Sequence, residues 1–208
     1  MVRDSYISLN GEWSFAYSQN MPSSFKERIT VPFPPESMLS GIERSHADKE
    51  KLYYKRSFII PSGFIKSKLI LHLGAVDQIC EVTVNGKFIG RGEGGYLPHS
   101  FDITDAANEG ENEIVVIAID TLSKLYPYGK QRKKRGGMWY TPISGIWQSV
   151  WIESLPENAV RDVRITANTE KATVEVISDA EDITLVIDNA EIIRDGQKFI
   201  VTPNDKRL

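Results

Sequence analysis

Apolar and polar residues alternate strictly in the middle of the chain. In CEVTV, residues 80–84, every second side chain is apolar, which predicts a β-strand with one buried face. Asn85 and Gly86 follow directly, and both tolerate the positive φ that a two-residue hairpin turn needs. Residues 87–91 are predicted to return as the partner strand, and the glycines at 90, 92, 94 and 95 to shape a tight loop. This hairpin favours an antiparallel β domain.

Further strand-like patterns lie on both sides of this hairpin. Leu69, Leu71 and Leu73 fall on one face of a strand, whereas 114–119 is continuously apolar and suits a strand buried on both faces. Long loops are predicted at 36–51 and 121–142, and no stretch has the pattern of an amphipathic helix. We therefore predict an all-β sandwich, with strands within 13–17, 29–33, 53–60, 68–73, 80–91, 113–120 and 146–153.

The last quarter of the chain has a different character. Leu155–Asn158 contains a proline and polar residues and is predicted to be a linker. Shorter strands are predicted beyond it, at 163–166, 172–176, 183–187 and 199–201. An immunoglobulin-like sandwich needs about 100 residues, so residues 159–208 are predicted to be part of such a module or a compact variant of it. Two domains follow, 1–155 and 159–208.

Composition and charge exclude several classes of partner. The 208 residues are 41% hydrophobic and 25% charged, with a net charge of −3, which gives no electrostatic case for nucleic acid or an anionic membrane. No apolar run reaches the roughly 20 residues of a membrane helix, and no signal peptide is visible. We expect a cytoplasmic protein, with secretion left open. Cys80 lies on the apolar face of its strand and is expected to be buried.

Several separate motifs carry a family resemblance. They are LNGEW at residues 9–13, then GAVD, VNG, GEGGY and SFDIT within 74–104, and GGMWYTPISGIWQSVWIE at 136–153. In order and spacing they resemble the N-terminal sugar-binding domain of glycoside hydrolase family 2, which contains β-galactosidases, β-glucuronidases and β-mannosidases. The resemblance covers roughly residues 7–155, and the tail resembles the start of the immunoglobulin-like domain that comes second in that family.

The resemblance implies a jelly-roll sandwich of the galactose-binding type, an immunoglobulin-like sandwich and then a (β/α)₈ barrel with the catalytic carboxylates. A barrel takes about 250 residues, more than this whole chain. We therefore expect no catalytic residue here, no activity of the chain alone, and a fragment or truncated product of a larger glycosidase that shapes the mouth of its active site. A stand-alone carbohydrate-binding module and a structural interaction sandwich are the alternatives, and a homo-oligomer is possible.

One departure from the family concerns an acidic residue. In members close to the bacterial β-galactosidases and β-glucuronidases, an aspartate of this domain reaches the active site of the barrel. That aspartate lies just before a Ser/Ala-Gly-Ile turn. Here no Asp or Glu lies between Asp120 and Glu153, and Trp139-Tyr140-Thr141 precedes Ser144-Gly145-Ile146. The identity of the sugar is therefore open.

Four residues are candidate contacts for carbohydrate. Trp139 and Tyr140 offer flat rings that can stack on a pyranose, or can instead pack the insertion against the rest of the protein. Arg132 belongs to a basic cluster, residues 130–135, that can attract a uronate or a phosphate, or can be a solvated loop. Asp77 precedes the hairpin, where a carboxylate can bind turn N–H groups or a ligand.

Two further groups are assigned no ligand. Trp147 and Trp151 are expected on the same face of one strand, as core or interdomain packing. The histidines, at 46, 72 and 99, are too scattered for a zinc site, so we expect neither a metal nor a cofactor.

Overall fold

The structure, a computed structural model, describes residues 5–133 and 136–205. It divides into two compact units, Met1–Ser154 and Leu155–Leu208, which are described separately. The sequence placed this boundary within 155–158. Both units are built from strands, and the described residues contain no α-helix, only the single 3₁₀ turn η1 (Met38–Ser40).

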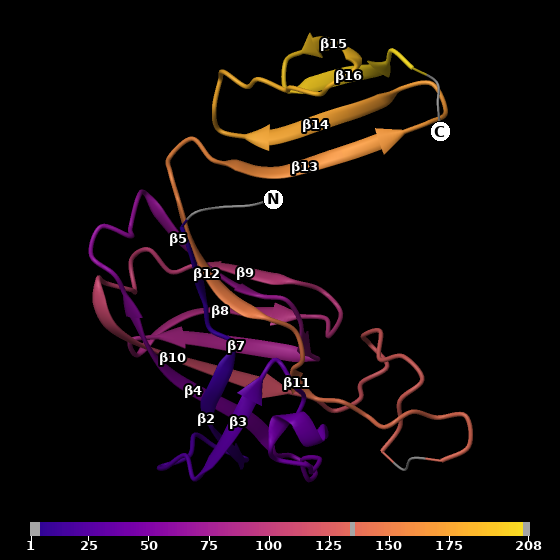
Figure 1. The fold of residues 1–208 in the computed structure, drawn as a ribbon. Coiled ribbons are helices and arrows are strands. Elements are labelled where there is room, and N and C mark those ends of the chain that lie inside the picture. The colour runs from indigo at the N-terminus through magenta and orange to yellow at the C-terminus, as the bar shows by residue number, and fades with distance from the viewer. Residues whose placement is uncertain (1–4, 134–135, 206–208) are drawn as a thin grey trace. The chain divides into compact units, whose positions relative to one another are not determined.

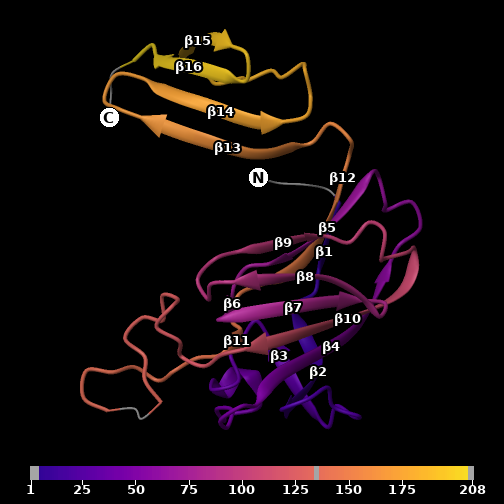
Figure 2. The same ribbon diagram turned by 180° about the vertical axis from the view of Figure 1, so that it is seen from behind.

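The first unit is a β-sandwich. Its six-stranded sheet has the order β3-β2-β4-β10-β7-β8, and its four-stranded sheet has the order β1-β12-β5-β9 (Figures 1 and 2). A short pair, β6 with β11, forms a third sheet. The strands are β1 (Tyr6–Ser8), β2 (Gly11–Ser18), β3 (Glu27–Val31), β4 (Lys51–Ile60), β5 (Lys68–Leu73), β6 (Val76–Asp77), β7 (Ile79–Val84), β8 (Lys87–Glu93), β9 (His99–Asp102), β10 (Gly110–Ile119), β11 (Gly145–Ile146) and β12 (Val150–Leu155).

The core lies between the two larger sheets. Strand β5 contributes the leucines at 69, 71 and 73, each with no exposed surface, as the alternation predicted. They pack with residues of the opposite sheet, among them Trp13, Phe15 and Tyr54. Cys80 is buried in the same cluster, and burial raises the pKa of its thiol to about 11. The prediction of a buried thiol is confirmed.

The predicted hairpin is β7 with β8, and its second strand is longer than expected. Asn85 and Gly86 form the turn with φ of 49° and 77°. Gly90 lies in β8, within the strand predicted over 87–91, whereas Gly92, predicted to be in the loop, also lies in β8. The reason is packing: a Cβ on Gly92 would lie 2.6 Å from the His99 ring, and one on Gly90 would lie 3.0 Å from the ring of Phe101. These glycines let β8 pass close to β9.

Trp147 and Trp151 do not share a strand face, so that expectation is wrong. Residues 147–149 separate β11 from β12, which breaks the alternation between the two tryptophans. Trp147 donates its Nε1 hydrogen to Gly95 O at 2.8 Å, whereas Trp151 stacks on His72 with ring centroids 4.8 Å apart.

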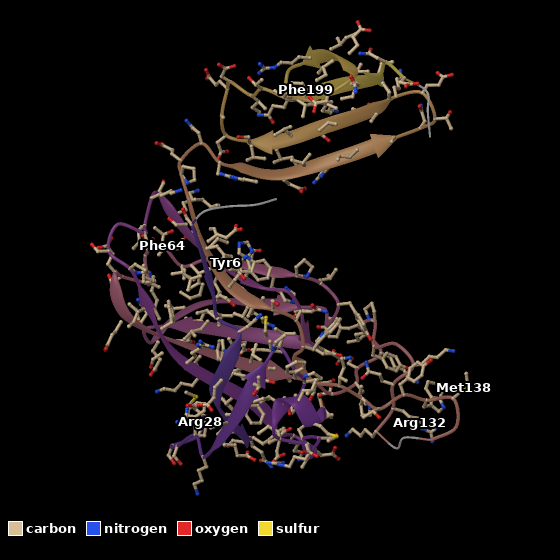
Figure 3. All side chains as sticks on the ribbon, viewed as in Figure 1. Tyr6, Arg28, Phe64, Arg132, Met138 and Phe199 are labelled. Atoms are coloured by element: carbon tan, nitrogen blue, oxygen red, sulfur yellow. The ribbon has the colours of Figure 1, made fainter. Side chains whose placement is uncertain are left out.

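The second unit is a four-stranded antiparallel sheet, β13-β14-β16-β15. Its small core contains Phe199 of β16, 2% exposed (Figure 3). The strand predicted at 183–187 is absent, and Ile183 is buried from a segment without strand pairing. A strand at 190–195, which the sequence analysis missed, pairs with β16 across Gly196. The bounds are β13 (Val160–Ala167), β14 (Ala172–Ser178), β15 (Ala190–Asp195) and β16 (Lys198–Pro203).

Candidate functional site

The insertion, residues 121–142, leaves the six-stranded sheet at the end of β10 and returns to the sandwich at β11. Figure 1 shows it as a long excursion from one end of the first unit. The loop that follows β3 meets it there, because Lys133 of the insertion forms an ion pair with Asp48. Two loops that are far apart in sequence therefore converge at this end of the sandwich.

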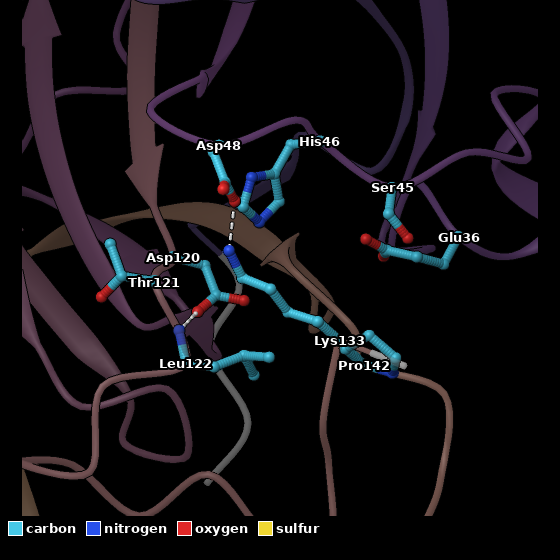
Figure 4. A pocket seen from close by; sticks show the side chains of 9 residues that line it. All are labelled: Glu36, Ser45, His46, Asp48, Asp120, Thr121, Leu122, Lys133 and Pro142. Carbon is cyan, nitrogen blue, oxygen red and sulfur yellow. Dashed lines mark hydrogen bonds and ion pairs between the residues drawn. The ribbon is translucent and has the colours of Figure 1, made fainter. Parts of the chain in front are cut away.

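A cavity of about 110 Å³ lies at this point, and we call it the root cavity (Figure 4). In Figure 4 the side chain of Lys133 runs toward Asp48, and Asp120 accepts a hydrogen bond from Leu122 N, 2.7 Å long. The cavity is smaller than the roughly 300 Å³ at which small-molecule sites usually start. It is lined by Glu36, Ser45, His46, Asp48, Asp120, Thr121, Leu122, Lys133 and Pro142.

Two carboxylates at the root cavity fix the ends of the insertion. Glu36 accepts hydrogen bonds from Ser144 N at 3.1 Å and from Ser144 Oγ at 2.8 Å, so it holds the returning chain. Burial raises the pKa of Glu36, and the bonds from Ser144 oppose that rise. Burial likewise raises the pKa of Asp120, against the bond from Leu122 N. The sequence analysis missed both roles, because neither residue belongs to a periodic pattern.

Asp77 lies beneath the glycine-rich loop and is completely buried. Its Oδ1 would be 2.2 Å from a Cβ on Gly95, so the carboxyl sits directly against that backbone. Neither oxygen accepts a hydrogen bond of normal geometry from the described residues. Burial, and secondarily the charge of Asp120, raises its pKa to about 7, while Gln131 opposes the rise. Burial leaves Asp77 no surface for direct contact with a sugar, and its carboxyl does not accept a hydrogen bond of normal geometry from a turn N–H among the described residues.

The other three candidates lie on the insertion. Arg132 and Trp139 come together, because the guanidinium carbon lies 5.7 Å from the ring centroid of Trp139. Both line an open pocket of about 300 Å³, which we call the insertion pocket. Tyr140 follows Trp139 in the sequence, is 65% exposed and does not line the pocket. The residues around the insertion pocket are Leu122, Lys124, Tyr128, Gln131, Arg132, Lys133 and Trp139.

Gln131 is the buried anchor of the insertion, 6% exposed. Its Oε1 accepts a hydrogen bond from Ile143 N at 2.6 Å, and its Nε2 donates to Tyr96 Oη at 3.2 Å. The backbone adds a bond from Tyr140 N to Lys130 O at 2.8 Å. These contacts hold the segment with Arg132 and Trp139 in one arrangement, which was not foreseen from sequence because Gln131 lies among charged residues.

The basic cluster is only partly described. Lys134 and Arg135 lie outside the described residues. Lys133 is paired with Asp48, while Arg132 and Lys124 line the insertion pocket. The described lining of that pocket therefore contains three cationic side chains and no carboxylate.

Metal ligands do not gather in the described part of the chain. No group of three or more His, Cys, Asp or Glu side chains lies close enough there to hold an ion. Within residues 5–133 and 136–205, no helix is long and apolar enough to cross a membrane.

Comparison with known proteins decides the family. Residues 42–156 match the sequence family described as glycosyl hydrolases family 2, sugar binding domain. The chain belongs to this family. The match spans more than half of the chain and includes the hairpin, the insertion and β12.

Curated relatives of this family 2 domain include glycosidases of two kinds. A β-galactosidase of Thermoanaerobacter pseudethanolicus is 25% identical over 202 residues, which cover 92% of this chain and 26% of the relative. A β-glucuronidase of Formosa agariphila is 22% identical over 168 residues, covering 71% of this chain and 17% of the relative. The chain thus spans about a quarter or less of the length of these relatives.

Solved structures have the same fold. A β-glucuronidase from Ruminococcus gnavus superposes with a TM-score of 0.69 at 22% identity, over 99% of this chain and 40% of that one. The β-D-glucuronidase of Dictyoglomus thermophilum gives a TM-score of 0.69 at 21% identity, over 99% of this chain and 39% of that one. At this identity the likeness establishes the all-β sandwich fold alone.

Proposed function

We propose that this chain is a non-catalytic, sugar-contacting region of a family 2 β-glycosidase. The observation that carries the proposal is the insertion pocket, in which the Trp139 ring and the Arg132 guanidinium lie side by side at the end of a family 2 sugar-binding domain. An aromatic ring can stack on the C–H face of a pyranose, and a guanidinium can bind a carboxylate with two parallel hydrogen bonds.

The charge of the pocket favours an acidic sugar. Lys124, Arg132 and Lys133 line it, and no carboxylate does so among the described residues. Attraction of a uronate follows from Coulomb's law, and it weakens as salt is added. The pocket is therefore proposed to bind the carboxylate of a β-uronide, with Trp139 and Tyr140 beside the ring. Hydrolysis is assigned to residues that are not in this chain.

Binding is tested by titrating the 208-residue chain with methyl β-D-glucuronide while amide shifts are followed by NMR. We expect a dissociation constant on the order of millimolar, with shifts in the insertion. W139A should weaken binding about tenfold. Tyr6→Ala, which removes a 50% exposed aromatic ring on β1, is the matched control and should change nothing.

Arg132→Gln separates charge from stacking. The variant should bind methyl β-D-glucuronide more weakly and bind methyl β-D-galactoside with unchanged affinity, because only the uronide carries a carboxylate. Equal affinity of both sugars for the parent chain would contradict the acidic-sugar assignment.

A hydrolysis assay of the 208-residue chain with chromophoric β-galactoside, β-glucuronide and β-mannoside should show no turnover. Turnover above that in buffer would overturn the non-catalytic assignment.

A further inference from the structure

A second open cavity lies at the other end of the first unit. Strand β10 pairs with β7 from Ile114 opposite Val84 to Ile119 opposite Ile79, and the insertion follows Ile119. The hairpin turn after Val84 is thus at the end remote from the insertion. The cavity there measures about 500 Å³, and we call it the edge cleft. It is lined by Ser67, Lys68, Lys87, Phe88, Ile89, Asp102, Thr104, Asp105 and Ala106.

The position of the edge cleft follows from the sheet order. Strand β8 is the last strand of the six-stranded sheet, and β9 is the last strand of the four-stranded sheet. The cleft takes residues from both, so it lies across the open side of the sandwich. Its volume falls within the roughly 300–1,000 Å³ range of small-molecule sites, and it is the larger of the two open pockets described above.

One wall of the edge cleft is apolar. Phe88 of β8 is 62% exposed, although large aromatic side chains usually bury most of their surface. Ile89 beside it packs against the core as a partly buried residue. Phe88 therefore offers a ring to a ligand on a strand that pairing with β7 holds in place.

The other wall is polar, with charges of both signs. Asp102 Oδ1 accepts hydrogen bonds from Thr104 N at 3.0 Å and Thr104 Oγ1 at 2.5 Å. Burial opposes ionisation of Asp102, but these bonds and the charge of Lys68 leave its pKa below the usual value. Lys87 Nζ contacts Asp105 O at 3.4 Å, a long bond that leaves the ammonium free to reorient. Two cations and two anions thus line the cleft, with no net charge.

We propose that the edge cleft binds a neutral saccharide, with one sugar ring stacked on Phe88 and its hydroxyls bonded to Lys68, Lys87 and Asp105. A pyranose has an apolar C–H face and a rim of hydroxyls that both donate and accept hydrogen bonds. Such a ligand matches an aromatic wall opposite interleaved donors and acceptors. A polyanion gains no net attraction here, because the carboxylates of Asp102 and Asp105 balance the ammonium groups of Lys68 and Lys87. The site is independent of the insertion pocket and of the function proposed for it.

The test is an NMR titration of the 208-residue chain with cellobiose and with lactose. We expect amide shifts at 67–69, 87–89 and 102–106 and a dissociation constant on the order of millimolar. Phe88→Ala should weaken binding about tenfold, whereas Phe88→Trp should keep it. Ile59→Ala is the matched control, because Ile59 is 64% exposed on β4 and does not line the cleft. Unchanged unfolding curves will show that the variants fold.

Several outcomes would overturn the site. Absence of these shifts up to about 50 mM disaccharide is one, and an unchanged affinity of Phe88→Ala is another. Tighter binding of D-glucuronate than of cellobiose at the same amides would refute the neutral-sugar assignment. Trp139→Ala should leave the shifts and the affinity of the edge cleft unchanged. The proposal for the edge cleft can therefore fail without the proposal for the insertion pocket failing, and the reverse.

Discussion

At the scale of single residues, the buried carboxyls at one end of the sandwich stand out. Glu36, Asp77 and Asp120 all have raised pKa values, with burial as the main cause for each. Hydrogen bonds partly offset the cost of burying two of these carboxylates. Ser144 donates to Glu36, and Leu122 N donates to Asp120. For Asp77 only Gln131 opposes the effect of burial, and neither carboxyl oxygen accepts a hydrogen bond of normal geometry from the described residues, so its pKa rises to about 7.

This difference makes the stability of the first unit depend on pH. The pKa of Asp77 is about 7 in the folded state, against an ordinary 3.8. Between these values the folded protein holds a proton that the unfolded chain has released. The free energy of unfolding therefore falls as pH rises from about 4 to about 7, by about 3 kcal/mol from this group, and levels off above.

Asp77→Asn should remove this part of the pH dependence. We expect the variant and the parent to differ little at pH 4 and the variant to be the more stable at pH 8. Urea unfolding followed by tryptophan fluorescence measures this, since all four tryptophans, at 13, 139, 147 and 151, lie in the first unit. Parallel curves of stability against pH for the two proteins would contradict the assignment.

At the scale of elements, the β7–β8 turn is fixed by one side chain as well as by its backbone. Asn85 Nδ2 donates to Ala106 O and to Asn112 Oδ1, both at 2.8 Å, and Asn85 Oδ1 accepts from Glu113 N at 2.8 Å. The turn is therefore tied to the start of β10 and to the 103–108 turn that lines the edge cleft.

Two variants of Asn85 separate these contributions. Asn85→Gly keeps the positive φ and loses the three hydrogen bonds, which should cost about 2 kcal/mol of unfolding free energy. Asn85→Ala should cost roughly 1 kcal/mol more, because alanine is strained at a φ of 49°. Urea unfolding measures both. Equal losses for the two variants would show that backbone strain at this turn is unimportant.

Patterns in the sequence predicted most strands of the first unit but not all those of the second, where the strand at 183–187 is absent and the one at 190–195 was missed, and they did not predict the site. The alternation in 68–73 and 80–84 predicted β5 and β7 because a half-buried strand has period two. Gly92 was misassigned to the loop because the His99 ring that it accommodates comes from β9, and no local pattern reveals that contact. Glu36 and Gln131 were missed for the same reason. The pairing of Arg132 with Trp139 depends on how the insertion folds, which is a long-range property.

At the scale of the whole molecule, the two units differ in the size of their cores. The hydrophobic cluster of the second unit contains five buried residues among those described, Val174, Val176, Ile183, Phe199 and Val201. The first unit buries several times as many, from both sheets. Because hydrophobic burial is the main favourable contribution to folding, the second unit should be the less stable of the two.

Urea titration should therefore reveal two transitions in the 208-residue chain. Tryptophan fluorescence reports the first unit alone, whereas far-UV circular dichroism reports both. We expect the dichroism to begin changing at lower urea, and the amides of 160–203 to exchange faster than those of β5 and β10. Coincident transitions by both probes, with uniform exchange protection, would show that the units unfold together.

The anchoring of the insertion has a consequence for how such a domain diversifies. Asp120 secures its departure from the sheet and Glu36 secures its return, while Gln131 and Lys133 fasten its middle to Tyr96 and Asp48. The positions of the insertion outside these contacts are the ones at which we expect substitutions to leave the sandwich unchanged. Variation at those positions would change the surface that the insertion presents without requiring a new fold.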